Sequence, residues 1–294
     1  MRHNPFQGTG LALVTPFAAD GSLDRAALVR LVNHSIDGGV DFLVVLGTTG
    51  ETATLATDEK KQVLETVAET TNGRIPLVVG VGGNNTAAVC AQLEAGLPSG
   101  YTGVLSVSPY YNKPTQEGIY QHYKAVCGST DAPVILYNVP GRTGSNVLAN
   151  TVLRVAQDCP NAVAMKEASG NLEQAMAIIQ SAPAGFDVLS GDDNLTLPLL
   201  ACGAKGVISV SGQAYPRLFS GMVRDARAGR LEDAQRAHYE LFTFTQLLFA
   251  EGNPGGIKAA LAHLGLCDNV LRLPLVPVSD ELNGKLRTLV AQLA

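Results

Sequence analysis

The chain has few of the residues that mark specialised classes of protein. Its five cysteines form no CxxC pair and its five histidines include no pair at helical ligand spacing, so neither a disulfide framework nor a structural metal is favoured. No apolar stretch approaches the roughly 20 residues that span a bilayer, and the early apolar run at 11–14 is too short for a signal peptide. The net charge of −5 offers no basic face to nucleic acid. These absences predict a globular protein of the reducing cytoplasm, without a metal, nucleic-acid or membrane partner.

The sequence does contain a regular alternation of short apolar runs and amphipathic segments. Eight runs rich in Val, Leu and Ile recur about every 28 residues, as expected for strands buried on both faces. They begin near Leu11, Phe42, Ile75, Val104, Val134, Ala162, Phe186 and Val207. Between them, segments such as 24–36 and 58–70 place apolar residues on one helical face, with Asp24 and Thr57 as expected N-caps. This arithmetic predicts an α/β protein with a (β/α)8 TIM barrel over residues 1–212.

After residue 212 the pattern changes to helices alone. The segments 215–228, 232–250, 255–264 and 279–293 have helical patterns, and prolines separate some of them. No Ser/Gly-rich linker precedes them, so we expect residues 213–294 to form a helical extension packed on the barrel. An open doubly wound sheet is the alternative fold, but it needs fewer strands and a site at a single crevice.

Polar or reactive residues follow nearly every apolar run at its C-terminal end. These clusters occupy residues 15–16, 47–51, 80–84, 109–112, 137–142, 166–167, 191–193 and 209–212. The opposite connections, such as 37–39 and 71–73, have the composition of ordinary turns. Catalytic groups of barrel enzymes gather at the C-terminal ends of the strands, so the sequence predicts a site at that end.

Three side chains in these clusters suit chemistry on a carbonyl substrate. Lys166 ends the run 162–165, where exclusion of water favours a neutral, nucleophilic amine that can form an imine. Tyr137 ends the preceding run and is expected beside Lys166, where a phenol can relay protons. Arg142 suits bidentate capture of a carboxylate. Each has an ordinary alternative: a lysine that reaches solvent or pairs with Glu167, a tyrosine packed on the rim, and a surface arginine.

Glycine-rich turns form a second group of candidates. Residues 47–51 (Gly-Thr-Thr-Gly-Glu) offer hydroxyls and backbone N–H groups that can hold a carboxylate or phosphate, but no lysine follows at the spacing of a Walker A loop. Residues 80–83 lack the dinucleotide fingerprint, and we interpret their glycines as permitting close approach of loops. Tyr110 and Tyr111 fit either a site or a subunit interface.

Five segments together carry a specific resemblance. They are 47–51, 109–114 (Pro-Tyr-Tyr-Asn-Lys-Pro), 137–144 (Tyr-Asn-Val-Pro-Gly-Arg-Thr-Gly), 166–171 (Lys-Glu-Ala-Ser-Gly-Asn) and 189–193 (Leu-Ser-Gly-Asp-Asp). With them, the chain resembles the dihydrodipicolinate synthase family of pyruvate-dependent class I aldolases from Gly8 to the segment 271–274. The resemblance implies a lyase that condenses pyruvate with L-aspartate-4-semialdehyde, the first committed step toward diaminopimelate and lysine, with no metal or diffusible cofactor.

The resemblance also implies roles for single residues. Lys166 would form a Schiff base with pyruvate. Tyr137 would shuttle protons together with Thr48 and with Tyr111, and Tyr111 would reach in from a neighbouring subunit of a homotetramer or homodimer.

Substrate contacts follow from the same resemblance. Thr49 and the backbone at Ile208 would hold the pyruvate carboxylate, and Gly191 would be a further substrate contact. Arg142 would hold the carboxylate of the semialdehyde. An N-acetylneuraminate or 2-keto-3-deoxy sugar-acid aldolase is the closest alternative, but such enzymes usually lack an arginine at this position. A non-catalytic pyruvate-sensing barrel should have lost Lys166 or Tyr137.

The chain departs from the family pattern in places. Residues 211–214 lack an asparagine that many members carry, and residues 253–258 have glycines where members often have bulkier residues and a second proline. We expect both segments to lie outside the groups that touch substrate. At the interface where L-lysine inhibits some relatives, Lys60 and Ala88 replace a histidine and a glutamate, so we expect lysine feedback to be weak or absent.

Overall fold

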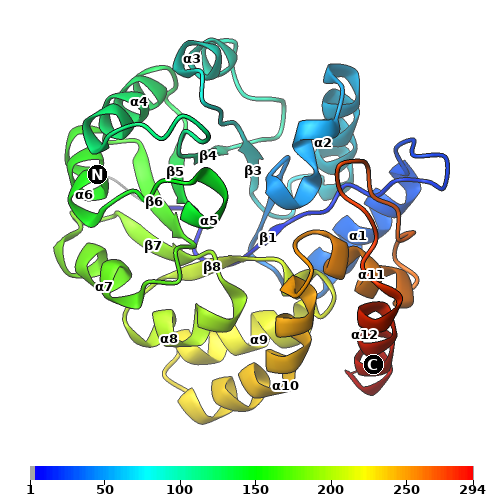
Figure 1. The fold of residues 1–294 in the computed structure, drawn as a ribbon. Coiled ribbons are helices and arrows are strands. Elements are labelled where there is room, and N and C mark those ends of the chain that lie inside the picture. The colour runs from blue at the N-terminus through cyan, green and yellow to red at the C-terminus, as the bar shows by residue number, and fades with distance from the viewer. Residues whose placement is uncertain (1–3, 294) are drawn as a thin grey trace.

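The eight apolar runs form eight parallel strands that close into one barrel in the computed structural model, which describes residues 4–293 (Figure 1). The strands are β1 (Gly8–Ala12), β2 (Phe42–Val45), β3 (Leu77–Gly80), β4 (Gly103–Val107), β5 (Val134–Asn138), β6 (Ala162–Glu167), β7 (Asp187–Ser190) and β8 (Gly206–Ser209). Each pairs with the next along the chain, and β8 pairs with β1. The predicted TIM barrel is therefore confirmed, and the open sheet is excluded.

Helices surround the barrel and connect the strands (Figure 1). They are α1 (Arg25–Asp37), α2 (Thr57–Thr71), α3 (Thr86–Glu94), α4 (Gln116–Gly128), α6 (Ala149–Asp158), α7 (Leu172–Ser181) and α8 (Thr196–Ala201), with a short α5 (Pro140–Thr143) after β5. Asp24 caps α1 as predicted, since its side chain accepts a hydrogen bond from the Ala27 N–H at 2.8 Å. Thr57 is not the N-cap of α2. That position is Ala56, and Glu59 reaches back to accept from the Ala56 N–H at 2.9 Å.

Aromatic rings fill the interior near the N-terminal ends of the strands. Phe6 and Phe42 are fully buried, and their ring centroids lie 5.7 Å apart. Gly103 and Gly10 leave the space that these rings occupy, because a methyl group at either glycine would lie 2.3 Å from a ring carbon. The N-terminal end is thus packed solid, which leaves the opposite end for the site.

Four helices follow the barrel within one or two residues of their predicted ranges. They are α9 (Pro216–Arg227), α10 (Leu231–Phe249), α11 (Gly255–His263) and α12 (Asp280–Leu293). Figure 1 shows α11 and α12 at the edge of the barrel, and the two helices contact each other. One continuous apolar cluster includes Leu28 of α1, Leu241 of α10 and Leu286 of α12. The extension is therefore packed on the barrel, while the boundary at 212/213 stays a prediction. Within residues 4–293 no helix is both long and apolar enough to cross a bilayer.

Gly256 explains how α11 approaches α10. A methyl group at this position would lie 2.2 Å from the backbone oxygen of Leu248, near the end of α10. Real side-chain carbons do not come this close to backbone, so the absence of a side chain lets the two helices pack here. The departure from the family pattern thus belongs to the packing of the extension.

We expect Gly256→Ala to lower the free energy of unfolding by about 3 kcal/mol, because backbone must move to relieve the overlap. The control is Gly284→Ala in α12, where a methyl group would meet nothing within 4 Å. Alanine there should raise stability by about 0.5–1 kcal/mol through helix propensity. Urea unfolding of both variants measures the difference, and equal effects would contradict the close approach.

Candidate active site

A cavity of about 550 Å³ opens at the C-terminal ends of the strands. Six of the eight residues singled out in the sequence line it: Thr48, Thr49, Tyr137, Arg142, Lys166 and Gly191. Tyr137 and Lys166 lie at the ends of β5 and β6, and the other four come from the connections after β2, β5 and β7, which the closed barrel gathers at one end. The predicted location of the site at this end of the barrel agrees with this cavity.

Lys166 and Tyr137 are neighbours across the β5–β6 ladder. They are register partners, and the Lys166 Nζ atom lies 4.5 Å from the centroid of the Tyr137 ring. Both are buried, with exposed fractions of 5% and 7%. The amine and the phenol ring therefore face the same space, as expected from the consecutive apolar runs that they end.

A second cavity, of about 500 Å³, adjoins the first. Thr48, Tyr137 and Arg142 line both, and the second extends to Lys60 of α2 and to Tyr110. Tyr137 and Arg142 thus stand where the inner cavity passes into the outer one. Both side chains can therefore contact a molecule in either cavity.

Two of the predicted site residues do not line either cavity in this chain. Ile208 is buried in the barrel interior among apolar side chains that include Leu189. Tyr111 lies at the surface with 87% of its area exposed, and its backbone φ is 76°. A non-glycine residue costs free energy in this left-handed region, and such strain is common at functional positions.

Asn253 is a site residue that the sequence did not predict. Its side-chain Nδ2 donates to Thr49 Oγ1 at 2.9 Å, its backbone oxygen accepts from Arg142 Nη2 at 3.5 Å, and it lines both cavities. The expectation that residues 253–258 lie outside the site is therefore wrong at Asn253. The physical reason is tertiary: the connection between α10 and α11 folds back over the strand ends, and no local pattern signals this.

An acidic pair completes the rim after β7. Asp192 lines the inner cavity, and burial together with the neighbouring Asp193 raises the pKa of its carboxyl. Asp193 is buried, and its Oδ2 accepts from the N–H groups of Val210 and Ser211 at 3.0 and 2.8 Å. It therefore fixes the chain after β8. The cluster 191–193 was visible in the sequence, but the separate roles of the two aspartates were not.

Hydrogen bonds hold the turn that carries the two threonines. Thr15 Oγ1 donates to the Gly50 oxygen at 2.7 Å, and Thr52 Oγ1 donates to the Gly47 oxygen at 3.0 Å. The turn contains two short 3-10 helices, η1 (Thr48–Gly50) and η2 (Thr52–Thr54). A methyl group at Gly80, the last residue of β3, would lie 2.3 Å from the Leu46 oxygen, so this glycine does permit close approach of the chain after β2, as predicted.

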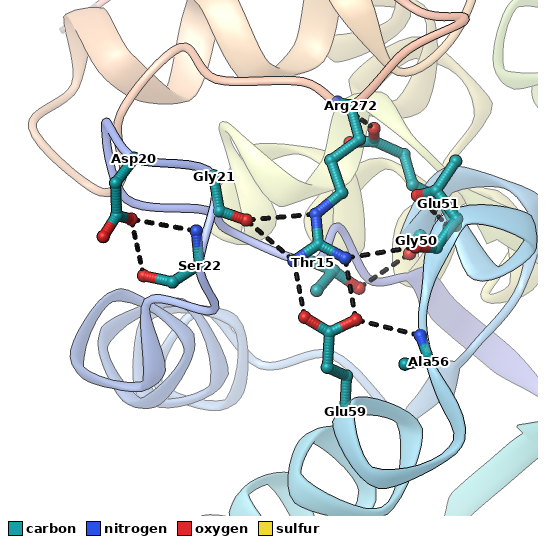
Figure 2. Close-up of polar contacts among 10 residues, drawn as sticks. Thr15, Asp20, Gly21, Ser22, Gly50, Glu51, Ala56, Glu59 and Arg272 are labelled. Carbon is teal, nitrogen blue, oxygen red and sulfur yellow. Dashed lines mark hydrogen bonds and ion pairs between the residues drawn. The ribbon is translucent and has the colours of Figure 1, made fainter.

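Arg272 ties the C-terminal extension to the same region (Figure 2). Its guanidinium donates to both oxygens of Glu59 at 2.7 and 2.5 Å and to the Gly21 oxygen at 3.0 and 2.7 Å. It also lies 4.3 Å from the ring centroid of Phe17. The guanidinium donates in a fork that matches the carboxylate, and the same group bridges α2 and the loop after β1.

The Arg272 guanidinium lowers the pKa of the Glu59 carboxyl to about 2, from 4.5 for the free group. Because the folded pKa is depressed, the pair stabilises the fold fully above pH 4.5 and loses its effect as pH falls toward 2. We expect the free energy of unfolding of wild type to exceed that of Glu59→Gln by only about 1 kcal/mol at neutral pH, because the pair is partly hydrated. Urea unfolding across this pH range should show the difference shrinking. A difference that does not change with pH would contradict the role of the ion pair.

Comparisons with known proteins agree with this geometry. The model of the dihydrodipicolinate synthetase family matches residues 5–293. The chain belongs to this family. A 4-hydroxy-tetrahydrodipicolinate synthase of Flavobacterium psychrophilum is 53% identical over 289 residues, which cover 98% of this chain and 99% of the relative.

Solved structures of the dihydrodipicolinate synthetase family superpose closely. The crystal structure of dihydrodipicolinate synthase from Thermotoga maritima has a TM-score of 0.96 and 41% identity, and covers 99% of both chains. The chloride-inhibited enzyme of Acinetobacter baumannii, complexed with pyruvate, has a TM-score of 0.94 and 38% identity, over 98% of this chain and 99% of that one. The chain is therefore an enzyme, a lyase of the class I aldolase type. The resemblance found in the sequence is confirmed, and the sugar-acid aldolase alternative gains no support.

Proposed function

We propose that the chain is a 4-hydroxy-tetrahydrodipicolinate synthase that condenses pyruvate with L-aspartate-4-semialdehyde through a Schiff base on Lys166. The observation that carries this proposal is the buried Lys166 amine, 4.5 Å from the Tyr137 ring, in a cavity that Arg142 also lines. Relatives that share about half of their residues with this chain have the same named activity. Their names support the synthase over the aldolase.

The reaction divides into three bond-forming steps. The neutral Lys166 amine attacks the ketone carbon of pyruvate, and loss of water gives an imine. The imine withdraws electrons, so a methyl proton leaves and the resulting enamine carbon attacks the aldehyde of the second substrate. The amino group of that substrate then attacks the imine carbon, closes the ring and expels the Lys166 amine. These steps need no metal or diffusible cofactor.

The surrounding side chains fit this sequence of steps. Tyr137 faces Lys166 and would carry protons to and from the carbonyl oxygens, with Thr48 in the same cavity. Thr49, Gly191 and the backbone at Ile208 would hold pyruvate. Arg142, at the passage between the two cavities, would bind the carboxylate of the incoming semialdehyde.

Borohydride reduction in the presence of pyruvate tests the central step. We expect inactivation, with a pyruvate-derived mass added to the peptide that contains Lys166. Lys166→Arg should lose nearly all activity because a guanidinium stays protonated and cannot attack the ketone. The matched control is Lys205→Arg, which alters a lysine that lies before β8, at the other end of the barrel. An adduct at any residue other than Lys166 would refute the assignment.

The exposure of Tyr111 supports a homo-oligomer, a homotetramer or homodimer. A tyrosine that is 87% exposed and held on a left-handed backbone is suited to enter a site of a second copy of the chain. There Tyr111 would extend the proton relay of Tyr137. We place this enzyme in the cytoplasm, where its cysteines would stay reduced.

Inhibition by L-lysine is expected to be weak. Lys60 lines the outer cavity together with Thr52 and Tyr110, so an ammonium group there would meet a like charge. Ala88 supplies no carboxylate partner, and loss of such a partner costs about 2–5 kcal/mol, or at least about thirty-fold in affinity. Initial rates should therefore change little at sub-millimolar lysine, and Lys60→His with Ala88→Glu should raise sensitivity. Half-inhibition of the wild type in that range would overturn this expectation.

A further inference from the structure

We propose that Lys258 is a positioning residue for pyruvate binding, because its ion pair with Glu51 holds the turn that presents Thr48 and Thr49. The inference rests on the proposed function, since it concerns how that turn holds pyruvate. Lys258 lies in α11 of the C-terminal extension, far along the chain from the turn, and does not line the cavities described above.

The ion pair is completely enclosed. The side chains of Lys258 and Glu51 have no exposed area, and Lys258 Nζ donates to Glu51 Oε1. The same ammonium donates to the Val270 oxygen at 2.8 Å and lies 4.1 Å from the centroid of the Phe17 ring. Glu51 Oε2 accepts from the Arg272 N–H at 3.0 Å. Both charges are thus hydrogen-bonded, and the extension holds both oxygens of Glu51.

The backbone at Glu51 shows why such a clamp is needed. Glu51 has φ 50° and ψ 35°, the left-handed conformation that joins η1 to η2. The left-handed conformation is unfavourable for a residue with a side chain, and such a residue adopts it only where surrounding contacts enforce it. The contacts of the Glu51 carboxylate with Lys258 and Arg272 hold the residue in this conformation. Without them, the turn can relax toward an ordinary backbone conformation and displace Thr48 and Thr49.

A second contact couples the same segment to the turn. Asn253, five residues before Lys258, donates from Nδ2 to Thr49 Oγ1 at 2.9 Å. The segment around the start of α11 therefore contacts the turn at two places, at Thr49 and at Glu51. A displacement of α11 would alter the group that holds the pyruvate carboxylate, even though α11 carries no reacting atom.

Stability alone does not account for the pair. The neighbours of Lys258 in α11 are buried and apolar, namely Ile257, Ala259, Ala260 and Leu261. Replacing a buried ion pair by well-packed hydrophobic residues of similar volume is often neutral or stabilising, so a buried pair is weak evidence of a purely stabilising role. Burial lowers the pKa of Lys258, and Glu51 opposes that shift.

The double variant Lys258→Met with Glu51→Gln tests the proposal without leaving a buried charge unpaired. We expect it to fold with a melting temperature near that of wild type, and to need about ten-fold more pyruvate for half-saturation because a small displacement of a binding group is costly. Half-saturation is measured both as KM and as the pyruvate dependence of borohydride trapping at Lys166. A purely structural pair would give a normal pyruvate requirement once the fold is restored.

The single variant Glu51→Gln provides a second measurement of the pyruvate requirement, and Val155→Ala is the control. Val155 is fully buried in α6, so its truncation should lower the melting temperature without raising the pyruvate requirement. The proposal is overturned if the double or the single variant folds and its half-saturation is unchanged. It is also overturned if both variants lose the fold. If wild type forms no adduct at Lys166, the proposed function fails instead. An adduct with unchanged half-saturation in the variants refutes only the role of Lys258.

Discussion

The hydrogen bonds between β1 and β8 are the constraint on which the rest of the structure depends. They join residues about 200 positions apart in register, from Gly8 opposite Gly206 to Leu11 opposite Ser209. A methyl group at Gly206 would lie 2.2 Å from the Gly8 oxygen, so the closure needs a bare backbone there. Because this pairing completes the ring, all eight strands end at one rim. The amine, the phenol and the guanidinium meet in one cavity for that reason.

The C-terminal extension has a second role besides covering apolar surface. Its helices bury residues such as Leu241 and Leu286 in the main core, while the connections between them reach the catalytic end of the barrel. Asn253, Lys258 and Arg272 contact the region of the 47–51 turn from three points. The barrel therefore supplies the candidate reacting groups, and the extension contacts the turn that lies beside them.

Most of the fold could be predicted from the sequence because the relevant signals are local. Apolar runs at a constant spacing predict strands directly, and the residue that follows each run is at the site end by geometry alone, which is how Lys166 and Tyr137 were found. The N-cap predicted for α2 is wrong because Glu59, inside the helix, accepts a hydrogen bond from the backbone N–H of the residue that precedes the helix. Asn253 and Lys258 were not assigned to the site or its support, since their roles arise from contacts across about 200 residues. A lysine in a helix has no local feature that distinguishes a buried ion pair from a solvated surface charge.

The packed N-terminal end of the barrel determines how molecules move through the site. With Phe6 and Phe42 filling the interior there, the cavity opens at the strand ends and offers no passage through the barrel axis. Whatever reaches Lys166 must therefore enter at the strand ends, and whatever leaves must return by the same end. If Lys166 forms the proposed imine, pyruvate would have to arrive before the semialdehyde, and the released water would have to leave by the same mouth. Two buried rings at the opposite end of the barrel would thus impose an order of arrival on the proposed reaction.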